Sequence, residues 1–412
     1  MEILFISHRI PFPPDRGDKI RSHNILKRLK QLAPVHVATF AEDDYDMREE
    51  VELAMLAHSY RLVHRHKSLY VAGAEALMAR KPVSLTAFDH PALRQYIEHV
   101  LSNRPIGAIF VFSGQMGQYV PDDFKGRVVM DFVDVDSAKF EAYAARKSFV
   151  SRWIDSREAR LLAAEEARLV HRADVSTLVT DVEAQLLRDR MAAAGSSDAE
   201  GKVRGLNNGI DSDYFSADRV DAEPALASIP GPRLIFTGQM DYLPNVEAAI
   251  RMIDRILPRI RENLPDASFH VVGRSPVPEL QQRHGRNGCY VWGRVADIRP
   301  WLKASDMAMI PLEIARGVQN KVLEAMAMGL PVVLSPEAAR GIDAVDGKEF
   351  LIGDSDDALA DAVVRLHNDG ELRDNLSAAA TAFTRHTMSW DAAMRDLPKI
   401  LGFSPRPALH VA

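Results

Sequence analysis

Short apolar runs alternate along the whole chain with longer segments in which apolar residues recur every three or four positions. The short runs predict β-strands and the longer segments predict amphipathic helices. In the first half the predicted strands are 3–7, 35–40, 61–63, 107–112 and 127–133, and the helices between them include 19–32, 47–57, 69–79 and 91–101. Asp181 is expected to cap a later helix, and Gly329 to end a helix that begins near residue 319. The same alternation resumes after residue 232. It predicts parallel sheets with helices on both faces, an α/β fold.

A chain of 412 residues is too long for one ordinary core, and a polar, Pro-containing segment at 216–232 separates two α/β halves. We expect a first domain over 1–210 and a second over 211–387. The amphipathic C-terminal helix, residues 388–402, is expected to pack back on the first domain.

Composition excludes several classes of protein. A net charge of −6 argues against a nucleic-acid binder, which usually has a basic domain. The single Cys289 cannot form an internal disulfide, which fits a reducing cytoplasm. No apolar run approaches the ~18 residues of a spanning helix, so we expect a cytoplasmic protein with at most peripheral contact at the inner face of the plasma membrane.

The most informative stretch is 306–335, which predicts strand, loop, helix and strand. Gly317 allows a ligand to approach the backbone N–H groups at the start of the helix, where the helix dipole favours an anion. Arg316 and Lys321 add two cations there, and Glu324 lies one turn further along. This pattern suits a diphosphate with a sugar hydroxyl beside it. An ordinary crossover with solvated charges at its mouth fits equally well.

The segment KVLEAMAMGLPVV resembles the nucleotide-sugar motif of GT-B glycosyltransferases of family 4. The resemblance implies two Rossmann-like, doubly wound parallel-sheet domains facing a cleft, with Glu324 binding the ribose hydroxyls of the donor. Arg316 occupies the position of the family's first Glu. With Asn320 and Lys321 before the Glu, GVQNKVLEAMA is more similar to the sugar transferases associated with PEP-CTERM/exosortase systems.

Gly238, in RLIFTGQMDYLPN, lies where the family binds the donor diphosphate with a Gly-Arg pair and a Lys. This chain has Gln239 and no Lys nearby, so the resemblance implies that cations from elsewhere replace them. The expected substitutes are Arg274, Arg294, Arg316 and Lys321.

In the first half, two places carry polar side chains after a predicted strand. Gly17 lies in a loop that resembles the family's cleft loop, and it can place an anion at the following helix. VVMDFVDVDSAKF ends in Asp134 and Asp136, and paired carboxylates can divide acid and base roles, so we take Asp134 as a catalytic candidate. The alternatives are that Asp136 or Ser137 caps the next helix, or that the pair binds a divalent cation.

Residues 61–81 are locally basic, with apolar residues between the charges. A solvated helix face explains this pattern. A surface that contacts anionic lipid headgroups or a phosphorylated lipid acceptor explains it too.

The resemblance implies a glycosyltransferase of the hexosyltransferase type (EC 2.4) that acts in exopolysaccharide biosynthesis. Its donor substrate is a nucleotide-diphosphate sugar and its acceptor a glycan or a lipid-linked molecule. We expect a retaining reaction with no cofactor and no metal. The alternatives are a sugar-nucleotide epimerase on the same scaffold, or a catalytically inactive GT-B interaction domain.

Overall fold

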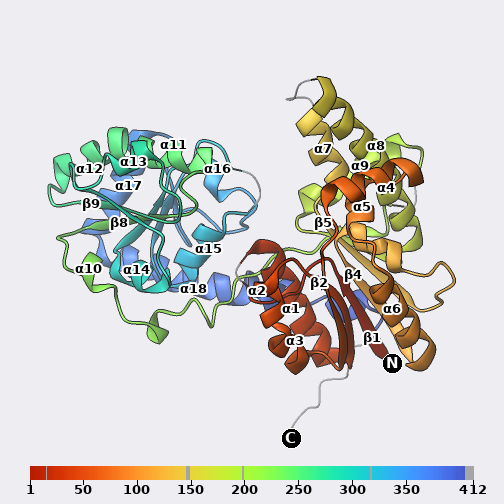
Figure 1. The fold of residues 1–412 in the computed structure, drawn as a ribbon. Helices are drawn as coiled ribbons and strands as arrows, with labels where there is room; N and C mark the ends of the chain where they lie inside the picture. Colours follow the sequence, from red (N-terminus) through yellow and green to blue (C-terminus); the bar gives the residue numbers. More distant parts are fainter. Residues whose placement is uncertain (15, 145–148, 197–198, 316–317, 404–412) are drawn as a thin grey trace, which may run out of the picture. The chain divides into compact units, whose positions relative to one another are not determined.

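The computed structural model describes residues 1–14, 16–144, 149–196, 199–315 and 318–403, and for residues 149–151 only the backbone. The chain forms two compact units. Unit 1 comprises Met1–Asn208 with Ala393–Ala412, and unit 2 comprises Gly209–Ala392. Each unit is a parallel sheet covered by helices (Figure 1).

The sheet of unit 1 has seven strands in the order β3-β2-β1-β4-β5-β6-β7, and every neighbouring pair is parallel. Its central strands are apolar and almost fully buried, as expected for a sheet covered on both faces. The strands are β1 Glu2–Ser7, β2 Val35–Ala41, β3 Ser59–His64, β4 Ile106–Phe112, β5 Arg127–Val133, β6 Val175–Leu178 and β7 Val203–Gly205.

Helices follow most of these strands. They are α1 Gly17–Leu32, α2 Asp44–Arg48, α3 Glu50–Leu56, α4 Leu69–Ala79, α5 Val83–Ala87, α6 Pro91–Asn103, α7 Asp136–Ala144, α8 Phe149–Arg172 and α9 Asp181–Ala193, with a 3₁₀ helix at Gly114–Tyr119. At the other end of the chain, α20 Leu397–Ile400 belongs to unit 1 and accepts a hydrogen bond from Arg127 Nε at the carbonyl of Ile400 (2.9 Å).

The sheet of unit 2 has six parallel strands in the order β10-β9-β8-β11-β12-β13. The strands are β8 Arg233–Thr237, β9 Ser268–Val272, β10 Cys289–Gly293, β11 Met307–Ile310, β12 Val332–Leu334 and β13 Leu351–Ile352. The helices are α10 Pro224–Ala227, α11 Leu243–Arg251, α12 Leu257–Asn263, α13 Pro278–Gln281, α14 Arg299–Ala304, α15 Asn320–Ala327, α16 Pro336–Ala339, α17 Asp356–Asn368 and α18 Gly370–Thr387. A 3₁₀ turn at Ala217–Arg219 and a π-helical turn at Met252–Ile256 complete the unit. Helix α19 Trp390–Ala393 ends at the first residue of the C-terminal part of unit 1.

Both sheets reverse their strand order at one point, between β1 and β4 in unit 1 and between β8 and β11 in unit 2. Helices that leave the strands on either side of such a point turn to opposite faces of the sheet, which opens a crevice at the carboxyl ends of the strands. The residues that follow β1, β8 and β11 are therefore the first places to look for a site.

Three sequence predictions about helices are wrong in detail. The helix predicted over 47–57 is the two short helices α2 and α3, and the C-terminal helix is α19 and α20. Asp181 does not cap α9, because the Thr180 hydroxyl accepts the capping bond from the Glu183 N–H (3.1 Å). Gly329 does follow the end of α15, in the left-handed conformation that the sequence predicts there.

Candidate functional site

In unit 2, Gly238 and Lys321 meet at the reversal point of the sheet. Gly238 follows β8, and Lys321 is in the first turn of α15, the helix after β11. The Lys321 Nζ donates a hydrogen bond to Asn245 Oδ1 (2.6 Å) and lies 4.4 Å from the centre of the Phe236 ring. A Cβ on Gly238 would lie 3.1 Å from this Nζ and 2.8 Å from Asn245 Nδ2, so only glycine leaves room for the approach. We call Gly238, Asn245, Lys321 and Glu324 the switch-point cluster.

Asn245 fixes the position of the lysine. It is buried in the first turn of α11, and its Nδ2 donates to the carbonyl of Gln239 (2.9 Å). That bond orients the amide so that Oδ1 faces the Lys321 ammonium. The Gln239 side chain in turn accepts a hydrogen bond from Arg274 Nη2 (2.8 Å), which links the loop after β8 to the loop after β9.

The carboxyl ends of β8, β9 and β10 approach one another through backbone alone. A Cβ on Gly273 would lie 1.6 Å from the carbonyl oxygen of Gly238, closer than any real contact. The Gly273 N–H donates to the carbonyl of Gly293 (2.9 Å). The site beside Lys321 therefore has a floor made of main chain.

Burial changes the pKa values of Lys321 and Glu324. Both side chains are half-buried in the first two turns of α15. Desolvation raises the pKa of Glu324 to about 7, although the nearby Lys321 opposes this shift. Desolvation also lowers the pKa of Lys321 to about 8, against the attraction of Glu324. An anionic ligand beside Lys321 would restore the stability of its charged form.

The remaining predicted residues of unit 2 lie as follows. Asn320, Arg274 and Arg294 are exposed, at the start of α15 and just after β9 and β10. Arg316 and Gly317 lie outside the described residues, so their predicted roles stay predictions.

Unit 1 contains a cavity of about 520 Å³ at the carboxyl ends of its first three strands. Its polar wall includes His8, Arg9, Glu42 and Arg65, and the Arg65 guanidinium lies 5.2 Å from the centre of the Phe88 ring. We call this space the unit 1 cavity.

His8 is the most distinctive group of the unit 1 cavity. Its ring stacks on Phe112 (5.7 Å between centres), and burial lowers its pKa, so the ring is neutral at pH 7. The Asp18 carboxylate, 3.4 Å from Nε2, favours the proton on that nitrogen. Nδ1 is then an acceptor, and it is buried without a hydrogen-bond partner among the described residues.

Gly17 begins α1 and is exposed. The start of this helix already carries a carboxylate, since Asp18 pairs with Arg9 and lies 3.5 Å from Arg16. Arg16 also donates to Glu42 (2.9 Å). An external anion at Gly17 would have to compete with Asp18 for the same cations.

Asp134 shares a lysine with Asp136. The Lys139 Nζ donates to Asp134 (2.8 Å) and to Asp136 (3.1 Å). At the start of α7, the Ser137 N–H and hydroxyl both donate to Glu166 (2.9 and 2.5 Å), a buried residue of α8. The described residues contain no group of three or more His, Cys, Asp or Glu placed to hold a metal ion.

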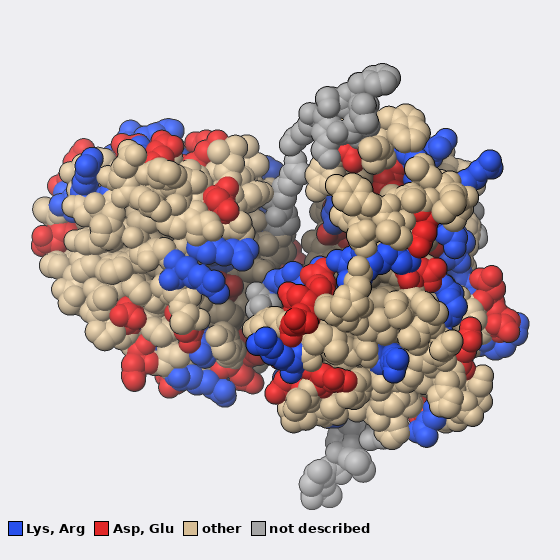
Figure 2. All heavy atoms as spheres, viewed as in Figure 1, with Lys and Arg blue, Asp and Glu red and all other residues tan. Residues whose placement is uncertain are grey.

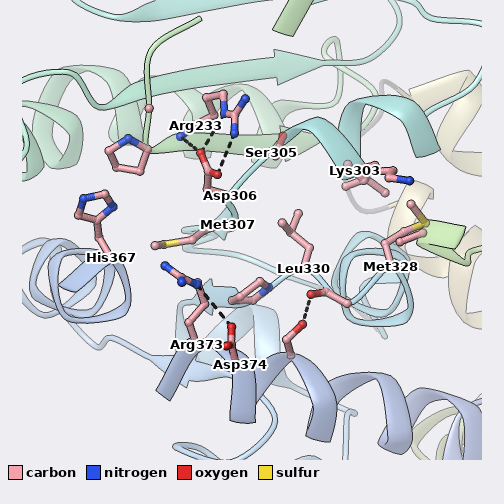
Figure 3. A pocket seen from close by; sticks show the side chains of 17 residues that line it. Arg233, Lys303, Ser305, Asp306, Met307, Met328, Leu330, His367, Arg373 and Asp374 are labelled. Carbon is pink, nitrogen blue, oxygen red and sulfur yellow. Dashed lines mark hydrogen bonds and ion pairs between the residues drawn. The ribbon is translucent and has the colours of Figure 1, made fainter. Parts of the chain in front are cut away.

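Unit 2 contains a cavity of about 590 Å³ at the edge of its sheet opposite the switch-point cluster (Figure 3). Arg233 opens β8 and Asp306 precedes β11, so these residues lie at the amino ends of strands whose carboxyl ends lead to Gly238 and α15. Their side chains form an ion pair (2.9 Å), with His367 facing them across the cavity. This cavity is separate from the switch-point cluster.

Sequence reasoning missed several residues of these sites. No sequence pattern singled out Asn245 or Gly273, although Asn245 lies in the segment around Gly238 that was compared with the family. Lys321, in contrast, was predicted as a substitute cation, and its Nζ does lie beside Gly238. In unit 1, Arg9 and Arg65 carried no motif.

Comparisons with known proteins extend this picture. Residues 231–369, which include the whole switch-point cluster, match the family described as Glycosyl transferases group 1. No curated protein sequence matches the chain.

Solved structures resemble the chain over nearly its whole length. They include HepE from Anabaena, solved in complex with UDP (14% identity, 98% of this chain and 100% of that chain, TM-score 0.60). Sucrose-phosphate synthase from Thermosynechococcus elongatus is also similar (14% identity, 97% and 98% covered, TM-score 0.58). A UDP-forming trehalose-phosphate synthase from Burkholderia xenovorans gives 13% identity, 97% and 98% coverage and a TM-score of 0.61.

The likeness to these structures and the two parallel-sheet units confirm the predicted GT-B fold. Together with the family match over 231–369, they support a glycosyltransferase.

Proposed function

We propose that the protein transfers a sugar from a nucleoside diphosphate sugar, bound by unit 2, to a hydroxyl group of an acceptor bound by unit 1. The observation that carries this proposal is the position of the Lys321 ammonium, which is held by Asn245 against the backbone of Gly238. A phosphate there meets a cation and the first N–H groups of α15 together.

Glu324 supplies the second half of the donor site. It lies three residues beyond Lys321 on α15, and residues at this spacing share a helix face. With the diphosphate at Lys321, its carboxylate accepts hydrogen bonds from the ribose hydroxyls. Arg274 and Arg294, exposed at neighbouring strand ends, are further cations for the diphosphate. Arg316 is a fourth candidate cation, because it precedes α15 in the sequence.

The chemistry follows from where negative charge develops. As the bond between the sugar and the diphosphate breaks, the leaving oxygen gains charge, and a fixed cation beside it stabilises the transition state more than the ground state. Lys321 performs this role without a metal ion. In unit 1, the neutral His8 ring has an acceptor nitrogen for a hydroxyl of the acceptor molecule. Asp134 stays a candidate for proton transfer, and its carboxylate forms an ion pair with Lys139.

The finer assignments rest on the sequence resemblance. It favours family 4 and its exosortase-associated branch, a retaining reaction, a glycan or lipid-linked acceptor, and a role in exopolysaccharide biosynthesis in the cytoplasm. HepE was solved with UDP-glucose as well as with UDP, so UDP-glucose is the first donor to test.

The test is a panel of nucleotide sugars incubated with the purified full-length chain. Donor-dependent release of a nucleoside diphosphate supports the proposal, and transfer to an added acceptor identifies the second substrate. Isomerised sugar without release of the diphosphate points instead to an epimerase. If no donor is bound or turned over, while the protein is folded, the chain is an interaction domain and the proposal is wrong.

A further inference from the structure

Helix α4 of unit 1 is apolar and faces outward. Its eleven residues, LYVAGAEALMA, include one charged side chain, yet its buried residues are Ala72 and Ala76. A helix on the surface of a globular protein normally turns its apolar side to the core. Here the large side chains are exposed: Leu69 68%, Tyr70 92%, Val71 51%, Leu77 58% and Met78 80%.

The outward orientation of α4 is fixed by polar contacts on its inner side. The Thr86 hydroxyl donates to the carbonyl of Ala72 (2.8 Å), and Arg157 of α8 donates to the carbonyl of Ala76 (2.8 Å). These bonds hold the small residues inward. The large apolar side chains therefore cannot turn into the core without breaking them.

Helix α8 continues the same surface. Trp153 and Ile154 are exposed (60% and 49%), and Trp153 lies one turn before Arg157, on the side of α8 that meets α4. Leu69 and Ile154 both line the unit 1 cavity, so the surface reaches the cavity mouth. We call Leu69, Tyr70, Leu77, Met78, Trp153 and Ile154 the α4–α8 surface.

Basic residues accompany this surface although the chain as a whole carries a net charge of −6. Residues 61–81 contain five Lys or Arg and a single acid, Glu75, which is paired with Lys67 (2.8 Å). Arg80 and Lys81 are exposed directly after α4. Figure 2 shows a mainly uncharged surface over α4 and α5, with both basic and acidic side chains beside it.

This combination fits a lipid surface better than a second protein. Tyr and Trp prefer the boundary between water and hydrocarbon, while Lys and Arg attract anionic headgroups. The fit is to the surface of a bilayer, since no helix in the described part of the chain is long and apolar enough to cross one.

We propose that unit 1 docks on an anionic lipid surface through the α4–α8 surface, which brings the mouth of the unit 1 cavity to the lipid headgroups. The substrate class follows for the transferase: its acceptor is a lipid-linked molecule, reached from the bilayer past Leu69 and Ile154. This last step rests on the proposed function, whereas the docking does not.

The test is co-sedimentation of the full-length chain with vesicles of phosphatidylcholine, with and without anionic phosphatidylglycerol. We expect binding to the anionic vesicles that weakens as salt is added. Met78→Asp should weaken it about tenfold or more, because insertion would bury a carboxylate. Met55→Asp is the matched control, an equally simple change at an exposed methionine of α3 in the same unit (60% exposed), and should bind as the unmodified chain does.

A second measurement reports on the surface directly. Fluorescence of the chain should shift to shorter wavelength on vesicle binding, and Trp153→Phe should remove most of that shift. Met78 is 80% exposed, so its variant should keep the helical content and melting temperature of the unmodified chain.

Three results would overturn the docking. The first is equal binding to neutral and anionic vesicles, and the second is unchanged binding of Met78→Asp. The third is a chain that does not bind vesicles but forms a dimer, which Met78→Asp dissociates. Binding is measured without any donor, so a chain that turns over no nucleotide sugar can still dock. An active enzyme that binds no vesicles and glycosylates a soluble acceptor would refute docking and leave the proposed function intact.

Discussion

Replacing Lys321 by methionine removes the ammonium of the switch-point cluster and keeps most of its aliphatic chain. The change deletes the bond to Asn245 Oδ1 and the contact of the ammonium with the Phe236 ring. Asn245 keeps its bond to the Gln239 carbonyl, so the loop around Gly238 should keep its shape.

The expected loss can be sized from the position of the charge. With its pKa lowered to about 8, Lys321 is roughly nine-tenths charged at pH 7. A hydrogen bond to a charged group is worth roughly 1.5–3 kcal/mol, about ten- to a hundredfold. The leaving diphosphate gains charge only as the bond breaks, so kcat should fall about a hundredfold or more, and KM for the donor should change less than about tenfold.

The assay is initial-rate release of nucleoside diphosphate with one accepted donor, over a range of donor concentrations. Lys348→Met, at a lysine of the same unit whose side chain is 69% exposed, is the control and should behave as the unmodified enzyme. A Lys321→Met enzyme with normal kcat would refute the assignment of the leaving-group charge to Lys321. If kcat is normal and only donor affinity falls, Lys321 acts in ground-state binding.

Four further outcomes are expected. Glu324→Gln should weaken binding of the nucleotide about ten- to a hundredfold in calorimetry, and unchanged affinity would take Glu324 out of the site. The rate at low donor concentration should rise with pH through about 7, as Glu324 becomes the better acceptor, and fall above about 8, as Lys321 loses its proton; a profile flat across this range would contradict both assignments. Activity should survive EDTA, and a complete loss restored by Mg²⁺ would make Asp134 and its neighbour metal ligands. Gly273→Ala should lower the melting temperature by more than about 5 °C because its Cβ meets a carbonyl oxygen, with Gly370→Ala as the tolerated control.

The sequence predicted the position of those helices and strands whose residues follow a clear local pattern of apolar and polar positions. Helix α4 has the bounds that its periodicity predicts, and β1, β4 and β5 lie where the apolar runs are. Helix ends were less reliable, as at Thr180, because two neighbouring residues of similar capping ability compete and only the backbone conformation decides between them.

The sequence predicted the residues of the candidate site that lie on one helix, but not the contacts between segments that are distant in the chain. Glu324 and Lys321 were recognised by a motif on one helix, and the motif also lies in the matched segment. That Lys321 reaches Gly238 depends on β8 lying beside β11, which is a property of the sheet order and not of either segment. The unit 1 cavity depends in the same way on β1, β2 and β3 ending side by side. The sequence alone therefore could not show that Arg9 and Arg65 line the same cavity.

The main-chain floor under the switch-point cluster limits how the enzyme could be redesigned. A side chain at Gly273 would collide with the Gly238 carbonyl, and one at Gly238 would crowd Asn245 and Lys321. Mutant libraries at these two positions should therefore return mostly misfolded protein. Side chains on the rim, such as Gln239, Arg274 and Arg294, are exposed and can be exchanged without disturbing the sheet. A search for variants with a changed choice of sugar donor should therefore randomise the rim and leave the floor as it is.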